Sequence, residues 1–192
     1  MSEKAKKIIK NNYIGLSIGI DPSLTETGMV GLRNGKIEFS HLIKTKKEGD
    51  TPAAELTRIK DIVNEIKFFL EKYHPTIVVM ESVAMNARNT TALIQLSGLN
   101  YMLRDIIFNY YTVYLVTPTG LKKFATGKGN CQKDLILLEL YKRYKISFNN
   151  NNSADAFVLA KIGEALINPE IKLIKAQEEV VSVIKKQHGS IN

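Results

Sequence analysis

The amino-acid sequence predicts an α/β fold in which helices flank a mixed five-stranded sheet. Three strand-like runs follow one another near the start, and a two-residue turn, Asn34-Gly35, joins the second and third as a hairpin. Two further strand-like runs alternate with amphipathic helices, a pattern typical of parallel strands. We therefore expect three antiparallel strands followed by two parallel ones.

The first strand, expected at residues 13–21, forms the centre of this sheet. The run from Ile14 to Asp21 is almost wholly apolar, and such a strand is usually covered on both faces. Pro22 follows at once and stops the strand. Asp21 is thereby expected at the carboxyl end of a central strand, where open α/β sheets gather their ligands.

The other elements follow from apolar spacing and from turn residues. Thr51-Pro52 is a typical helix start, with Thr as N-cap and Pro in the first turn, and His74-Pro75 ends that helix. Further strands are predicted at residues 27–33, 36–44, 76–81 and 112–116. Helices are predicted at residues 52–72, 90–110, 119–125, 132–144, 153–167 and 171–187.

The length of 192 residues fits one domain, which we place at residues 13–168, between a basic arm at 1–12 and a C-terminal, helical extension at 169–192. No apolar run reaches the ~20 residues of a membrane span, and no signal-peptide core follows the basic N-terminus, so a cytoplasmic protein without membrane contact is expected. The single cysteine, Cys131, excludes an internal disulfide. The net charge of +8 fits either plain solubility or a polyanionic partner such as nucleic acid.

Two of the apolar strands end on an acid, Asp21 and Glu81. Unpaired carboxylates are costly to bury, so two of them at strand ends predict a charge cluster that metal ions compensate. Simpler interpretations stay open for each residue. Asp21 could begin an Asx turn with Ser23, and Glu81 could pair with a lysine.

Four segments, taken in order, resemble one family. Residues 18–28, Ile-Gly-Ile-Asp-Pro-Ser-Leu-Thr-Glu-Thr-Gly, resemble the opening motif of RuvC-type Holliday junction resolvases, which belong to the ribonuclease H-like superfamily. Residues 79–83 are similar to the second acidic strand of that family, residues 121–133 to its basic DNA-facing segment, and residues 154–160 to its last acidic helix. The likeness runs from about residue 14 to 167, and the wording of the basic segment resembles phage-borne members.

The resemblance implies a Mg²⁺-dependent endonuclease that cleaves four-way, and also other branched, DNA junctions in recombination and repair. Two Mg²⁺ ions, for which Mn²⁺ could substitute, would be held by Asp21 as the bridging ligand, by Glu81 on the neighbouring strand and by Asp155 from a helix. Asn152 stands where the family has an acid or a histidine. Its amide oxygen can coordinate Mg²⁺ but adds no charge, so one ion would bind more weakly. Alternatively, Asn152 and Asp155 could simply be the N-cap and third residue of a helix.

The basic segment supplies the expected DNA contacts. Lys122 and Lys133 match phosphate-facing lysines of the family, and Lys123 and Lys128 add charge to the same segment, although a solvated charged loop would look alike. Lys133 near a helix start opposes the helix dipole, which favours a ligand there.

The base-stacking aromatic of the cellular enzyme is replaced by Ala84. Phe124 and Tyr101 are the candidate substitutes, with Met85 as a partial one, and without the aromatic we expect a looser sequence preference.

A four-way junction has two equivalent strands to cut, so the resemblance also implies a homodimer. The helix at residues 90–110 is the candidate interface, although its apolar positions could equally all belong to the core. Two other functions stay open: a ribonuclease H-like nucleic-acid-binding module that has lost catalysis through Asn152, and a fragment of an actin-like phosphate-binding ATPase. The second is disfavoured because the chain is short and lacks the second Asp-Gly-Gly motif.

Overall fold

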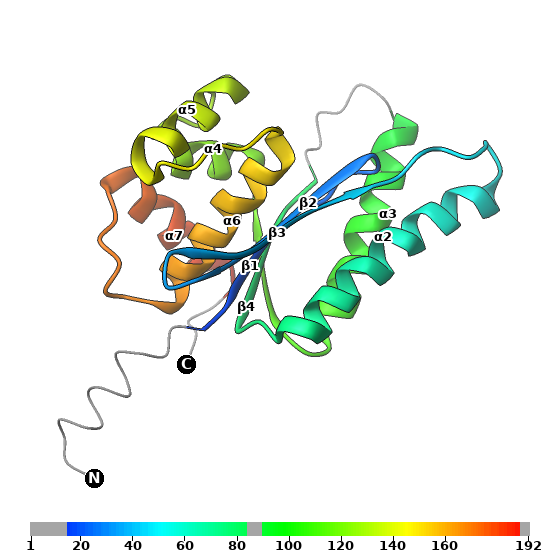
Figure 1. The fold of residues 1–192 in the computed structure, drawn as a ribbon, viewed down its shortest axis with the longest axis horizontal. Helices are drawn as coiled ribbons and strands as arrows, with labels where there is room; N and C mark the ends of the chain where they lie inside the picture. Colours follow the sequence, from blue (N-terminus) through cyan, green and yellow to red (C-terminus); the bar gives the residue numbers. More distant parts are fainter. Residues whose placement is uncertain (1–14, 84–89, 189–192) are drawn as a thin grey trace, which may run out of the picture.

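The computed structural model describes residues 15–83 and 90–188, which form a five-stranded sheet between two layers of helices (Figure 1). The strands lie in the order β3-β2-β1-β4-β5, with β1 antiparallel to β2, β2 antiparallel to β3, and β4 parallel to both β1 and β5. This confirms the predicted mixed sheet. The strands span Ser17–Asp21 (β1), Glu26–Arg33 (β2), Lys36–Lys44 (β3), Ile77–Glu81 (β4) and Thr112–Val116 (β5).

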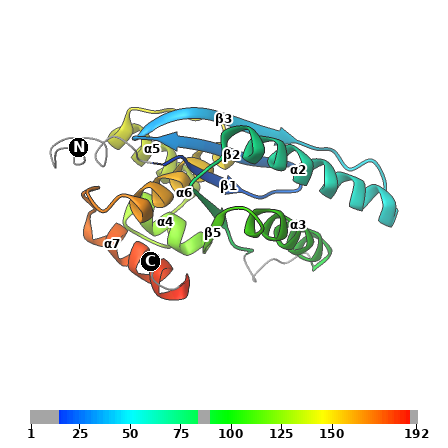
Figure 2. The same ribbon diagram turned by 90° about the horizontal axis from the view of Figure 1, so that it is seen from below.

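Six helices accompany the sheet in the described residues, and they divide between its two faces (Figures 1 and 2). Val78 and Met80 of β4 pack with α2 and α3, whereas Ile77 and Val79 pack with α4 to α7, because successive side chains of a strand point to opposite faces. The helices span Pro52–Tyr73 (α2), Thr90–Phe108 (α3), Pro118–Thr126 (α4), Lys133–Tyr144 (α5), Asn151–Ile167 (α6) and Lys175–His188 (α7).

Local signals set the element boundaries as the sequence predicts. Asn34 and Gly35 have φ values of 53° and 76°, the left-handed conformations that a tight hairpin turn needs. Thr51 caps α2 by accepting a hydrogen bond from the Ala54 amide at 3.2 Å, and the helix ends where His74 turns left-handed with φ 45°.

Helix α6 lies directly on β1 and is buried along most of its length. A Cβ on Gly19 would stand 2.0 Å from the carbonyl oxygen of Ala156, so only glycine allows this approach of helix to strand. The Ser17 hydroxyl adds a hydrogen bond of 2.8 Å to the carbonyl oxygen of Ala160. This close contact holds the start of α6 beside the end of β1.

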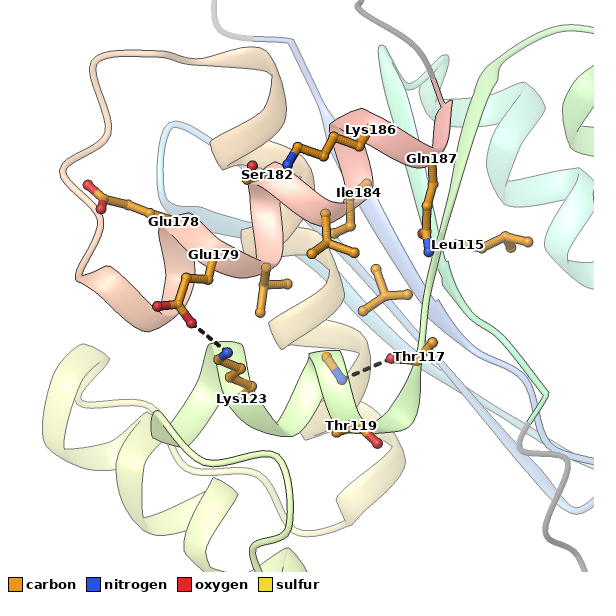
Figure 3. Close-up of a pocket in the computed structure, with 14 residues that line it drawn as sticks. Leu115, Thr117, Thr119, Lys123, Glu178, Glu179, Ser182, Ile184, Lys186 and Gln187 are labelled. Carbon is orange, nitrogen blue, oxygen red and sulfur yellow. Dashed lines mark hydrogen bonds and ion pairs between the residues drawn. The ribbon is translucent and has the colours of Figure 1, made fainter.

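The region beyond residue 168 contains α7, which packs on α4 (Figure 3). Val180, Val181 and Ile184 of α7 belong to the same buried cluster as α6, so the predicted extension is helical and shares the core of the domain. The predicted basic arm at residues 1–12 lies outside the described residues. None of the helices in the described ranges has the length and apolar content that crossing a membrane requires.

Candidate active site

Three acids that are far apart in the sequence line one cavity at the edge of the sheet. Asp21 and Glu81 are the last residues of β1 and β4, and Asp155 lies one turn into α6. Because Ile20 and Met80 point to the α2–α3 side, the next residue of each strand points toward α6. The cavity measures about 600 Å³, and Asn152 lines it too.

Burial raises the pKa values of all three acids. Burial, reinforced by the charges of Glu81 and Asp155, raises the pKa of Asp21 well above its ordinary value. Asp21 and Glu81 share a side-chain hydrogen bond, and burial, the largest cause, raises the pKa of Glu81 to about 7. Burial raises the pKa of Asp155 to about 6, against the lowering effect of Lys133 and Lys122. The cluster therefore holds more negative charge than its surroundings neutralise.

Two of the simpler interpretations, those for Asp21 and for Asn152, do not match the contacts. The Ser23 amide donates to the Thr27 hydroxyl at 3.0 Å, and not to Asp21 as an Asx turn would require. The N-cap of α6 is Asn150, whose side chain accepts from the Ser153 amide at 2.7 Å, so the interpretation of Asn152 as the cap is wrong. Asp155 consequently lies beyond the capping turn.

Asn152 faces the cavity from the first turn of α6. Its Nδ2 donates a hydrogen bond of 2.5 Å to the carbonyl oxygen of Glu26, which anchors α6 to the start of β2. This contact orients the amide side chain, and its acceptor oxygen is the atom with which it could serve a cation.

The basic segment divides between two sides of α4. Lys122 of α4 and Lys133 at the start of α5 line the cavity with the acids. Lys123, the neighbour of Lys122, points to the other side and pairs with Glu179 of α7 at 2.6 Å (Figure 3). Lys128 is exposed in the loop between α4 and α5. Lys122 and Lys133 thus lie at the cavity and Lys123 contacts α7, while the DNA contacts of these lysines stay a prediction.

The acids line one cavity but do not form a ready-made metal cage. In residues 15–83 and 90–188, no group of three or more His, Cys, Asp and Glu side chains stands close enough to hold a metal ion as the site is arranged here. Asp21 contacts Glu81, and Asp155 acts on both through its charge.

Comparisons with known proteins assign this arrangement to a family. The sequence profile described as "Crossover junction endodeoxyribonuclease RuvC" matches residues 17–162, which contain all three acids. The chain belongs to the RuvC family. Its members of that name are hydrolases that act on phosphodiester bonds of DNA, and this chain is an enzyme of that class.

Individual RuvC proteins are similar over most of their length. The protein from Chlamydia muridarum is 29% identical over 158 residues, which cover 76% of this chain and 88% of the relative. That from Rickettsia bellii is 27% identical over 150 residues, covering 74% and 92%. These relatives are bacterial and give the predicted phage origin no support.

Solved structures show the same fold. Thermus thermophilus RuvC in complex with Holliday junction substrate matches with a TM-score of 0.65 at 21% identity, covering 76% of this chain and 90% of that one. The yeast mitochondrial Holliday junction resolvase Ydc2 matches with a TM-score of 0.55 at 15% identity, covering 89% and 83%. The ribonuclease H-like fold predicted from the RuvC resemblance is thereby confirmed.

The predicted stacking aromatic is only partly placed by the structure. The prediction for Phe124 is wrong, because its side chain is 3% exposed and belongs to the core under α4, where no base can reach its ring. Tyr101 on α3 is 68% exposed and stays a candidate. Ala84 and Met85 lie outside the described residues.

Three polar residues at this RuvC-family site were not foreseen from the sequence. Arg58 of α2 and Gln95 of α3 line the cavity from the far side of the sheet. Asn100 of α3 is 1% exposed and donates to the carbonyl oxygen of Glu81 at 3.1 Å, which holds the end of β4 in place. An asparagine inside an apolar helical stripe was a usable signal for the last of these.

Proposed function

We propose that the chain resolves four-way DNA junctions as a divalent-cation-dependent endonuclease, with Mg²⁺ as the working ion and Mn²⁺ as a possible substitute. The observation that carries this proposal is the convergence of Asp21, Glu81 and Asp155 on one cavity that Lys122 and Lys133 also line, in a chain of the RuvC family. Because its substrate is DNA, the enzyme would act in the cytoplasm of a bacterial cell.

The residues present fit divalent cations. The cavity is lined by carboxylate and amide oxygens, which Mg²⁺ prefers, and an ion that keeps several waters needs only a few protein ligands. Burial raises the pKa values of the acids, and a cation bound among them would favour their ionised forms. When bound, two divalent cations would stabilise the developing charge of the phosphate and acidify the attacking water.

The side chains of the chain itself divide the work. Asp21, on the central strand and in contact with Glu81, would serve both ions, while Glu81 and Asp155 would each hold one of them. Asn152 would add a neutral oxygen donor. Lys122 and Lys133 would hold the phosphodiester backbone in the cavity by charge, which positions the scissile bond over the acids.

A homodimer through α3 completes the proposal. The exposed side chains of Ile94, Tyr101 and Phe108 recur at intervals of seven residues and form a stripe on the outer side of α3, while Leu99 and Leu103 are buried in the core. Such a stripe is the seam that two packed helices share. We expect this stripe to contact the same stripe on a second copy of the chain, because a dimer has two equivalent sites that can act on two strands of one junction.

The test is cleavage of a mobile four-way junction with labelled strands in Mg²⁺. The wild-type protein should nick two strands symmetrically, and Asp21→Asn should bind the junction while cleaving at least about 100-fold more slowly. Binding without nicking by the wild type would support the non-catalytic binding module instead. A protein that neither binds nor nicks junctions would overturn the proposal.

A further inference from the structure

The cavity at the acids continues onto the other side of the sheet. Arg58 of α2, Gln95 of α3 and Leu24 line both the 600 Å³ cavity and an adjoining one of about 130 Å³. The helices α2 and α3 cover the opposite face of the sheet from α4 and α5 (Figures 1 and 2). Because Arg58 belongs to α2, it lines the cavity from the side away from Lys122 and Lys133. The acids therefore lie between cations on both sides.

The guanidinium of Arg58 is braced from the loop that follows Asp21. Its Nε donates to the Thr45 hydroxyl at 3.1 Å, and that hydroxyl in turn donates to the carbonyl oxygen of Leu24. This two-step connection fixes the side chain relative to the acidic site, and among the residues that the structure describes it engages only the Nε donor. The two terminal nitrogens carry the remaining N–H groups, in the planar fork that matches a phosphate.

The α2 carboxylate that lines the smaller cavity with Arg58 is already engaged. Glu55 accepts a hydrogen bond of 2.8 Å from Nε2 of Gln95, and no ion pair of Arg58 is found in the described residues. An arginine that lines a cavity without a carboxylate partner is suited to an external anion.

The smaller cavity beyond Arg58 is acidic, which limits how far a DNA strand can extend past this residue. The smaller cavity is lined by Glu48, Asp50 and Glu55, while its lysine, Lys47, pairs with Asp50. A DNA strand would be repelled there, so Arg58 stands at the border between the basic and acidic parts of the groove.

We propose that Arg58 is a DNA-binding residue that holds one backbone phosphate of the cleaved strand, on the flank of the scissile bond opposite to Lys122 and Lys133. The inference rests on the proposed junction-cleaving function and deepens it. Lys122 and Lys133 would hold the DNA strand on one side of the scissile bond, and Arg58 would hold it on the other side. Beyond Arg58 the strand would turn away from the acidic residues of the smaller cavity. Two such holds would keep the scissile phosphate from sliding along the cavity.

The experiment compares Arg58→Gln with Lys60→Gln, which removes the same charge from an exposed position of α2 that lines neither cavity. Junction affinity is measured in EDTA over a range of salt concentrations. Arg58→Gln should weaken binding about tenfold and reduce the salt slope by about 0.9, whereas Lys60→Gln should leave both unchanged. Arg58→Lys, which keeps the charge and loses the fork, should recover only part of the affinity.

The phosphate that Arg58 contacts is located with junctions in which one phosphate near the scissile bond is replaced by a neutral methylphosphonate. At one position beside the scissile bond, the neutral group should lower the affinity of the wild type about tenfold and leave the affinity of Arg58→Gln unchanged, because that variant has already lost the contact. On the other side of the scissile bond, Lys133→Gln should be the variant whose affinity does not change. Additive losses at every position, or an Arg58→Gln variant that matches Lys60→Gln while the wild type still cleaves, would refute the role of Arg58 alone. Failure of the wild type to bind or cleave junctions would refute the proposed function instead.

Discussion

Among the individual residues of the site, Asn152 combines a structural and a candidate ligand role in one amide. Its Nδ2 holds the Glu26 carbonyl oxygen at 2.5 Å, which an acid at this position could not do. The family resemblance puts an acid or a histidine there. This chain therefore exchanges a charged donor for a contact that ties α6 to β2.

That exchange predicts opposite effects of Asn152→Asp on cation affinity and on stability. The added charge should lower the Mg²⁺ concentration for half-maximal cleavage, with activity at saturating Mg²⁺ kept or raised. Loss of the hydrogen bond to Glu26 should destabilise the cation-free protein by about 1–2 kcal/mol. Cleavage titrations and urea unfolding in EDTA measure the two effects, and a large loss of activity at saturating Mg²⁺ would remove Asn152 from the ligand set.

Asp155 predicts a pH dependence of the stability without cations. Burial raises its pKa from 3.8 to about 6, so the folded protein retains this proton at pH values where the unfolded chain has released it. The stability contributed by the neutral form is complete below about pH 4 and is lost as pH rises to about 6. Relative to Asp155→Asn, the wild type should thus be about 2–3 kcal/mol less stable at pH 8 than at pH 4.

Unfolding of both proteins in urea, at several pH values in EDTA, gives this difference. A gap between them that stays constant with pH would show that Asp155 is not desolvated as described. Adding Mg²⁺ at pH 8 should stabilise the wild type more than the variant, because the cation offsets the charge that burial disfavours.

The sequence predicts some site residues better than others for physical reasons. Asp21 and Glu81 could be found because each ends an apolar strand, and strand parity then fixes the face that they share. The cap of α6 could not be chosen, because residues 149–152 are all asparagine and any of them can cap a helix. Phe124 was misplaced because only the docking of α4 decides which of its sides is buried.

At the scale of elements, α4 carries adjacent lysines to different surroundings. Consecutive residues of a helix point about 100° apart, so Lys122 reaches the acidic cavity while Lys123 reaches Glu179. Lysines that follow one another in the sequence therefore need not share a ligand.

This geometry predicts a contrast between two neighbouring substitutions. Lys122→Gln should reduce the slope of log affinity for junction DNA against log salt by about 0.9, because one phosphate contact is lost. Lys123→Gln removes the same charge from the same helix and should leave the slope unchanged. Fluorescence anisotropy over a salt series measures both, and equal effects of the two variants would mean that α4 binds DNA through charge alone, without a defined face.

The helix α7 illustrates what element prediction misses. Its helical character follows from apolar spacing at Val180, Val181 and Ile184, but the partner of that apolar face does not. The structure supplies α4 and α6 as the partner, which makes the segment after residue 168 part of the core. Contacts between elements that are distant in sequence leave no local sequence signal. Such contacts decide whether a terminal helix belongs to the domain core or forms a separate extension.

At the scale of the whole molecule, the structure resolves the ambiguity of α3 that the sequence leaves. Leu99, Leu103 and Ile107 pack in the core, while Ile94 and Phe108 are 66% and 78% exposed. The apolar residues thus serve two separate sides of the helix. Beside the stripe, the guanidinium of Arg104 lies over the Tyr101 ring, and its Nε is buried with no hydrogen-bond partner within the described part of the chain.

The exposed stripe predicts that assembly and paired cleavage fail together. Tyr101→Asp places a charge at the centre of the stripe, where its desolvation in a two-fold contact would be doubled, and should convert a dimer to a monomer. Lys60→Asp, on an exposed side of α2, changes charge without touching the stripe and should stay dimeric. Sedimentation measures the mass, and a supercoiled plasmid with a cruciform separates one nick from two cuts in one binding event. The monomer should nick without paired cuts, and a Tyr101→Asp protein that remains dimeric and makes paired cuts would place the interface elsewhere.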